Sequence, residues 1–144
     1  MEIRELLEGE TRLAYEAMRA LRPAYASEAD FVARVDGTQR AEGYRLVAAF
    51  VADREPAVSA AGFRIGHNLS WGRYLYVDDL STLPEARGQG HAGALLDWLE
   101  AEARRLGCDQ LHLDSGTGPE RFAAHRIYHA HELAITAHHF ARAL

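Results

Sequence analysis

The chain has 144 residues, a formal net charge of −5 and 48% hydrophobic residues, which is the size and composition of one globular domain. All 16 cationic side chains are arginines, and the absence of lysine excludes Schiff-base enzymes, pyridoxal-phosphate enzymes and P-loop NTPases. The negative charge predicts no nucleic-acid or membrane partner, and no apolar run approaches the roughly 20 residues that span a bilayer. We expect a single soluble domain over residues 1–144, in the cytoplasm because the only cysteine, Cys108, fits a reducing compartment.

The N-terminal part of the chain predicts a strand followed by two helices. Residues 1–7 can form a short strand, and the apolar spacing over residues 10–21 predicts a helix that Pro23 ends. Ser27 is a suitable N-cap for the second helix, for which Gly37 is the expected end.

The rest of the chain predicts strands first and then alternating helices and strands. Three β-prone runs with turns at 53–56 and 66–70 predict an antiparallel meander, over residues 44–52, 57–66 and 71–80. A long helical pattern covers residues 90–106, with Gly107 as its C-terminal stop, and a short strand follows over 110–114. Pro119 suits the first turn of a helix that runs to about Ala130. Residues 133–140 alternate weakly and predict a last strand.

The predicted order of elements is therefore β–α–α–β–β–β–α–β–α–β. The strand–helix–strand unit over residues 71–114 is long enough for a right-handed parallel crossover. This predicts an α/β or α+β fold with a mixed sheet, antiparallel in its N-terminal part and with central parallel strands. Ligands of such sheets bind beyond the carboxyl ends of parallel strands, which makes the segment after Leu80 the candidate binding site.

The segment after Leu80 is rich in small residues and leads directly into the long helix. Small residues let a ligand approach the backbone, and a helix N-terminus presents unpaired N–H groups, so the segment suits a pyrophosphate. The pattern is neither a Gly-x-Gly-x-x-Gly fingerprint nor a P-loop. Because lysine is absent, phosphates must be met by backbone N–H groups and arginines, with Arg87 as the first candidate. A loop kept only for tight packing is the alternative.

Two motifs resemble those of the GNAT superfamily, the acyl-CoA-dependent N-acetyltransferases. The family signature Arg/Gln-x-x-Gly-x-Gly/Ala is matched by Arg87-Gly88-Gln89-Gly90-His91-Ala92. The family's Ala-x-x-x-Tyr helix is matched by Ala124-His125-Arg126-Ile127-Tyr128. The motifs stand in the family's order with a strand between them and cover about residues 75–140, whereas the first 70 residues match only in the order of elements.

The resemblance implies acetyl-CoA as a co-substrate and no metal. Backbone N–H groups of residues 89–93 would hold the pyrophosphate, and residues 80–82 would pair with the pantetheine arm as a further strand. The cofactor-binding residues expected on this basis are Leu80, Ser81, Thr82, Arg87, Gly88, Gln89, Gly90, His91, Ala92 and Gly93.

Two adjacent carboxylates, Asp78 and Asp79, stand at the end of the strand that leads into this segment. Adjacent carboxylates repel, so a cation between them or a raised pKa of one of them is expected, and solvated acids at an exposed strand end are the alternative. The run 75–80 resembles the acidic step of spermidine/spermine-type members, which implies Asp78 as the base, through water, and Asp79 as the residue that attracts the substrate ammonium. A regular strand would send the two side chains to opposite faces. The resemblance implies a β-bulge on this strand, which could bring both towards the cleft.

Tyr128 stands where the family places the tyrosine that faces the thioester sulfur, so the resemblance implies that it protonates the leaving thiolate. A core aromatic side chain is the alternative. Two positions depart from the family pattern: its usual Asn seven residues before the tyrosine is Arg121, and its Gly-Phe after the helix is Glu132-Leu133.

The histidines do not indicate a metal site. His125 and His129 are spaced to share one helix face, but no third ligand has suitable spacing. His138 or His139 could serve as the base in place of Asp78, because an ordinary histidine titrates near neutral pH.

The expected function is transfer of the acetyl group of acetyl-CoA to the primary amine of a small, cationic acceptor, by direct attack in a ternary complex. One alternative is a non-catalytic acyl-CoA-binding sensor or interaction domain, and another is a protein or peptide N-acetyltransferase. A pure binding domain would need neither Asp78 nor Tyr128. Homodimers are common in the family, so a homodimer is a further expectation.

Overall fold

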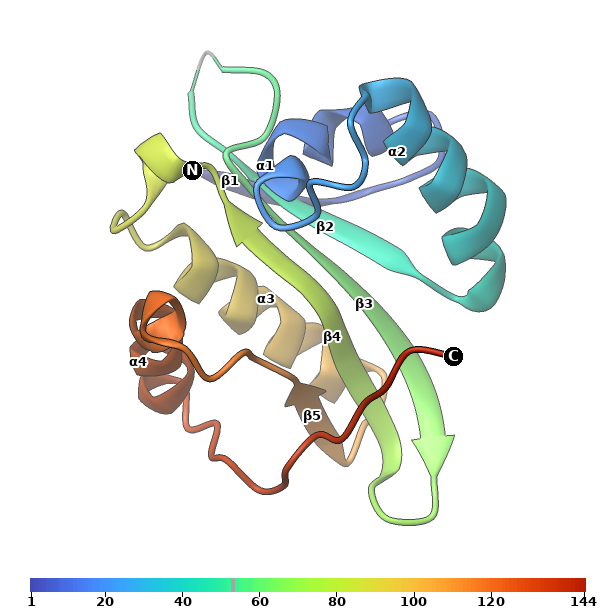
Figure 1. The fold of residues 1–144 in the computed structure, drawn as a ribbon, viewed down its shortest axis with the longest axis vertical. Coiled ribbons are helices and arrows are strands. Elements are labelled where there is room, and N and C mark those ends of the chain that lie inside the picture. Colours follow the sequence, from blue (N-terminus) through green and yellow to red (C-terminus); the bar gives the residue numbers. More distant parts are fainter. Residues whose placement is uncertain (53) are drawn as a thin grey trace. The chain divides into compact units, whose positions relative to one another are not determined.

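The computed structural model describes residues 1–52 and 54–144 and contains two compact units, residues 1–113 and 114–144 (Figure 1). The first unit holds a five-stranded sheet whose strands lie side by side in chain order. These strands are β1 (Glu2–Leu6), β2 (Arg45–Phe50), β3 (Ser59–Asn68), β4 (Gly72–Thr82) and β5 (Gln110–Leu113). Strands β1 to β4 are antiparallel and β5 joins β4 in parallel, so the predicted mixed α+β fold is confirmed. The turn predicted at 53–56 includes residue 53, which lies outside the described residues.

Several short helical segments and one long helix accompany the sheet. In the first unit they are η1 (Thr11–Ala14), α1 (Tyr15–Arg19), α2 (Glu28–Arg34), η2 (Val35–Gln39), η3 (Arg40–Glu42), η4 (Pro84–Ala86) and α3 (His91–Arg105). The second unit contains η5 (Pro119–Arg121) and α4 (Phe122–Ala130). None of the helices in the described residues combines the length and apolar character that crossing a membrane requires.

The end predicted for the second helix is wrong. Ser27 caps α2 as predicted, because its hydroxyl accepts a 3.1 Å hydrogen bond from the backbone N–H of Asp30. Gly37, however, lies inside the continuous helical backbone of α2, η2 and η3, and Gly43 ends it with a φ of 90°. A glycine within a helix lowers its stability without breaking it, whereas the left-handed conformation at the end favours glycine strongly.

Different helices cover the two faces of the sheet. Leu46 and Ala48 of β2 belong to a buried cluster that includes Phe31 of α2, so this side is the α1/α2 face. Phe63 of β3 points the other way and meets Trp98 of α3 edge-on, with 5.9 Å between ring centroids. The long helix therefore covers the opposite face, which we call the α3 face. Figure 1 shows this helix running along the sheet.

The predicted last strand over residues 133–140 does not form. The backbone after Ala130 contains a turn and then extended or irregular segments up to Leu144. Ile135 and Phe140 remain 80% and 92% exposed, so the weak alternation of this segment buries no apolar face. A strand without a buried face has nothing to specify its register, which explains why the pattern did not become a strand.

Candidate active site

A bulge in β4 lies at the acidic pair. Gly62 of β3 pairs with Asp79, whereas the next residue, Phe63, pairs with Val77, so Asp78 is an extra residue in β4. One inserted residue resets the alternation of side chains. The carboxylates of Asp78 and Asp79 both contact side chains of the α1/α2 face, and the predicted bulge is confirmed.

The carboxylate of Asp78 is bound by Arg64 of β3. Nε and Nη2 of Arg64 each donate a 2.7 Å hydrogen bond, one to each carboxylate oxygen. This bidentate pair raises the pKa of Arg64, whose guanidinium also lies 5.8 Å from the ring centroid of Tyr76. Asp78 keeps about 25% of its side-chain surface exposed. Any cationic group that reaches Asp78 must therefore share the carboxylate with Arg64.

The carboxylate of Asp79 accepts hydrogen bonds from two distant elements. Nε of Arg22 donates to Oδ1 at 2.7 Å, and the hydroxyl group of Tyr44 donates to Oδ2 at 2.9 Å. Burial, and then the charge of Asp79, raises the pKa of Tyr44 well above its ordinary value, so this phenol keeps its proton. Asp79 thus links β4 to the α1–α2 connection and to the start of β2.

The acidic pair is balanced by two cations that the sequence motifs did not reveal. Arg22 is 57 residues from Asp79 along the chain, and Arg64 is 14 residues from Asp78. Neither arginine stands in a recognisable motif. The only signal in the sequence was the repulsion between adjacent carboxylates, which predicted a cation without saying which one.

The loop between β4 and α3 has free space beside its backbone at two glycines. Gly88 and Gly90 have φ values of 73° and 86°, and a Cβ atom at either position would meet open space. Within the described part of the chain, no side chain caps the N-terminus of α3, and its first turn has no acidic residue. Arg87 is exposed and its Nε donates a 3.4 Å hydrogen bond to the carbonyl oxygen of Thr82. This helix end can therefore offer free backbone N–H groups to an anion.

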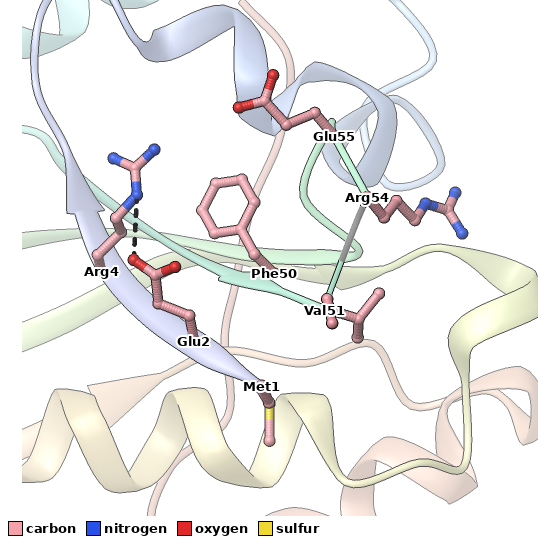
Figure 2. A pocket seen from close by; sticks show the side chains of 8 residues that line it. Met1, Glu2, Arg4, Phe50, Val51, Arg54 and Glu55 are labelled. Atoms are coloured by element: carbon pink, nitrogen blue, oxygen red, sulfur yellow. Dashed lines mark ion pairs between the residues drawn. The ribbon is translucent and has the colours of Figure 1, made fainter.

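His91, the first residue of α3, contributes its backbone rather than its side chain to this loop. The residue is only 5% exposed, and its Nδ1 lies 3.3 Å from Sδ of Met1, which precedes β1. Figure 2 shows Met1 beside α3. What His91 can offer a ligand at this helix end is therefore its backbone N–H group.

Beyond the bulge, β4 has an unpaired edge. Pairing of β4 with β5 ends at Val77, whereas pairing with β3 continues to Thr82. Among the described residues, no strand of the sheet pairs with residues 78–82 on this edge. A ligand that carries amide groups in an extended chain can add to such an edge.

In the second unit, Tyr128 lies in α4 and its side chain is buried. Nη2 of Arg121 lies within 3.4 Å of the hydroxyl oxygen and donates to it. Burial raises the pKa of Tyr128, and the Arg121 charge opposes this only in part. The phenol is consequently protonated at neutral pH. The departure from the family pattern at position 121 thus places a cation beside this phenol.

Two histidines of the second unit, His125 and His139, have partners within that unit. Nε2 of His125 lies 2.8 Å from the carbonyl oxygen of Gly116, and His129 is exposed. Nδ1 of His139 lies 2.7 Å from the carboxylate of Asp114. Among the described residues, no group of three or more His, Cys, Asp or Glu side chains could hold a metal ion.

A separate hollow of about 680 Å³ lies where β1 passes the end of β2 (Figure 2). It is lined by Met1, Glu2, Arg4, Phe50, Val51, Ala52, Arg54 and Glu55. Glu2 and Arg4 form an ion pair at 3.6 Å, and the Arg4 guanidinium lies 4.9 Å from the ring centroid of Phe50. None of the predicted site residues lines this hollow.

Comparison with known proteins identifies the family. A family model described as "Acetyltransferase (GNAT) family" matches residues 4–132. A search among the sequences of curated proteins finds no match. The structure is similar to an acetyltransferase from Trypanosoma brucei, with 21% identity, a TM-score of 0.80 and coverage of 99% of both chains. It is also similar to a putative acetyltransferase from Agrobacterium tumefaciens, with 19% identity, a TM-score of 0.80 and full coverage of both chains.

The aminoglycoside N-acetyltransferase AAC(6′)-Iy, in complex with CoA, has the same fold, with 16% identity and a TM-score of 0.81. The similarity covers 99% of this chain and 93% of that one. The matched range 4–132 includes the acidic pair, the glycine-rich loop and the helix that carries Tyr128. This chain therefore belongs to the acetyltransferase (GNAT) family, whose members use acetyl-CoA as a co-substrate.

Proposed function

We propose that this protein transfers the acetyl group of acetyl-CoA to the primary amine of a small acceptor that arrives as a cation, by direct attack in a ternary complex. The observation that carries this proposal is the β4 bulge. It turns Asp78 and Asp79 to one face of the sheet, at the point where the unpaired edge of β4 begins. Acetylation of an amine needs a base near the amine and a place for the pantetheine arm of acetyl-CoA. The acidic pair can supply the base, and the adjacent edge of β4 can pair with the amides of the arm.

The two proton transfers are assigned to Asp78 and Tyr128. An alkylammonium must lose a proton before its nitrogen can attack, and Asp78 accepts this proton through a water molecule. The nitrogen then forms a C–N bond to the thioester carbonyl carbon, and the C–S bond breaks. Tyr128 gives its proton to the departing thiolate. The second proton of the attacking nitrogen leaves as the tetrahedral intermediate collapses and restores the phenol through solvent.

The co-substrate is assigned to the open loop and the β4 edge. Backbone N–H groups at Gln89 to Gly93 hold the pyrophosphate, and Arg87 supplies a positive charge. Leu80, Ser81 and Thr82 pair with the pantetheine arm. The uncapped N-terminus of α3 and the left-handed Gly88 and Gly90 support this assignment.

The acceptor is assigned to the neighbourhood of the acidic pair. Asp79 contributes negative charge near the bulge, although both of its oxygens already accept hydrogen bonds. Asp78 is more exposed than Asp79, so its carboxylate is the more accessible of the two to an incoming amine. Because Arg22 and Arg64 neutralise the pair, an acceptor with one ammonium group fits it better than one with several.

A thiol-release assay with acetyl-CoA and a panel of small amines tests the proposal. Asp78→Asn should lower kcat by about 10²- to 10⁴-fold and leave the KM for acetyl-CoA nearly unchanged. The matched control is Asp97→Asn on the exposed side of α3, which should retain wild-type kcat. If Asp78→Asn has wild-type kcat, Asp78 is not the base, and His138→Ala and His139→Ala become the variants to measure.

The same assay separates the other functions. Acetyl-CoA binding without turnover of any amine would favour a non-catalytic sensor. Turnover of peptides in preference to small amines would favour a protein N-acetyltransferase. A single domain over residues 1–144, a cytoplasmic location and a homodimer stay predictions.

A further inference from the structure

Arg22 has no part in the proposed proton transfers, yet it makes two bonds to the β4 bulge. Its Nε donates to Oδ1 of Asp79 at 2.7 Å, and its Nη2 donates to the backbone carbonyl oxygen of Asp78 at 3.1 Å. Asp78 is the extra residue that has no partner in β3. Arg22 therefore donates to the backbone carbonyl group of Asp78, the residue that is unpaired in the β3–β4 ladder.

Tyr44 holds the same carboxylate from the other side. Its hydroxyl group donates to Oδ2 of Asp79 at 2.9 Å. The hydroxyl lies so close to the backbone of Gly62 that a Cβ atom there would overlap it, and Gly62 is the residue that pairs with Asp79 across the bulge. The phenol is 5% exposed and can only donate at neutral pH.

The bulge is therefore held by groups from three segments of the chain besides β4. Arg22 follows α1, Tyr44 precedes β2, and Gly62 lies in β3. A shift of the bulge by one residue towards the C-terminus would turn the side chain of Asp79 to the α3 face, and a shift by one residue towards the N-terminus would turn that of Asp78 there. The two bonds from Arg22 oppose both shifts, because one holds the carboxylate of Asp79 and the other holds the backbone carbonyl group of Asp78.

We propose that Arg22 is a positioning residue for acetyl transfer, which keeps the bulge at Asp78 and so keeps the carboxylate of Asp78 on the α1/α2 face. The inference rests on the proposed function, in which Asp78 is the base. Arg64 has a different role, because it binds the Asp78 carboxylate directly rather than the backbone. Arg22 acts only through Asp79 and the Asp78 carbonyl group.

Steady-state kinetics on three variants test this inference. Arg22→Gln should lower kcat by about 10- to 100-fold, because displacement of a catalytic group by about 1 Å has effects of this size. The KM for acetyl-CoA should stay within about twofold, because its proposed contacts lie elsewhere. Arg22→Lys should restore part of kcat, since one ammonium can reach Asp79 but not both acceptors. The control Arg19→Gln removes an exposed arginine of α1 that pairs with Glu16, and it should behave as wild type.

Hydrogen exchange gives a second readout that does not depend on turnover. Arg22→Gln should speed the exchange of β4 amides around residues 77–80, while the midpoint of thermal unfolding changes by less than about 4 °C. Tyr44→Phe, which removes only the hydroxyl group, should speed exchange at the same amides.

Two results would overturn the inference. One is wild-type kcat in Arg22→Gln, and the other is unchanged exchange around the bulge in that variant. Loss of kcat together with a large fall in thermal stability would also overturn it in favour of a general structural role. If the wild-type protein turns over no amine, the proposed function fails, but the exchange measurement still decides whether Arg22 holds the bulge.

Discussion

The phenol of Tyr44 lies directly against the backbone of Gly62, at the point where β3 pairs with the bulge of β4. Gly62 is needed here because of this close approach and not because of a turn, since it lies inside a strand. The packing lets the Tyr44 hydroxyl reach Asp79 across the sheet surface. Because Gly62 has no Cβ atom, Tyr44 can pack here and hold the carboxylate of Asp79 in its position beside Asp78.

Gly62→Ala should destabilise the protein by about 1–3 kcal/mol, because a methyl group would displace the buried Tyr44 ring. Thermal unfolding monitored by circular dichroism should show a midpoint lowered by several degrees. The matched control is Gly37→Ala, where a Cβ atom would meet nothing within 4 Å and the backbone is helical. That variant should be as stable as wild type or slightly more stable. Equal midpoints for both variants would contradict the packing argument.

Gly90→Ala should weaken acetyl-CoA binding by at least about tenfold, because a methyl group would enter the space in which the backbone meets the pyrophosphate. The measurement is the KM for acetyl-CoA together with its Kd by calorimetry. Gly9→Ala separates backbone strain from ligand contact, since Gly9 has a similar φ of 91° and equally open surroundings in the turn after β1. Both variants should lose similar stability, and only Gly90→Ala should lose affinity. Equal affinity in the two would remove Gly90 from the site.

Tyr128→Phe should lower kcat by about 10²-fold or more and change the affinity for acetyl-CoA little, because the phenol is proposed to act only on the leaving thiolate. The pH profile gives an independent check. The protonated phenol is the active form, and burial raises the pKa of Tyr128 above its ordinary value of 10.0. This group should therefore cause no loss of kcat below about pH 10. A fall in kcat between pH 8 and 9 that Tyr128→Phe abolishes would contradict the raised pKa.

Glu132→Gly should stabilise the protein by about 1 kcal/mol, because Glu132 adopts the left-handed conformation with a φ of 63°. It follows the end of α4, where the backbone N–H groups of Glu132 and Leu133 donate to the carbonyl oxygens of His129 and Tyr128 at 3.0 Å each. Denaturant unfolding measures the change. Glu132→Ala keeps a Cβ atom and should give no such gain, so an equal gain in both variants would show that the side chain rather than the backbone is responsible.

Glu102 of α3 should make stability depend on pH on the acid side. Its buried carboxylate accepts hydrogen bonds from Arg105 and Arg45, and Arg105 is the main reason why its pKa lies below the ordinary value of 4.5. A lowered folded-state pKa gives stability that is present above the unfolded-state value and is lost as pH falls through the folded one. Unfolding midpoints measured between pH 7 and pH 3 should fall less steeply in Glu102→Gln. That variant should also be less stable at pH 7, because the two arginines lose their partner.

Local patterns in the sequence determined most of the elements and both family motifs. Gly88 and Gly90 predicted a loop before α3 whose backbone a ligand can approach, and both adopt positive φ values. Tyr128 lies on a helix, as its motif predicted. Repulsion between Asp78 and Asp79 predicted a cation beside them and the family resemblance implied a bulge, and both are present. These features depend on residues close together in the chain, so alternation, capping preference and backbone conformation were sufficient to find them.

The tertiary structure alone decided which groups surround the acidic pair and which segments become strands. Arg22 and Tyr44 reach Asp79 from elements remote in the chain, and no short pattern encodes such a contact. Residues 133–140 alternate like a strand, but their apolar side chains find no surface to cover. The missing lysine, visible at once in the sequence, limited the cations of this protein to arginines. Only the folded sheet, which brings distant strands and loops together, determined that Arg22 and Arg64 are the arginines that neutralise the acidic pair.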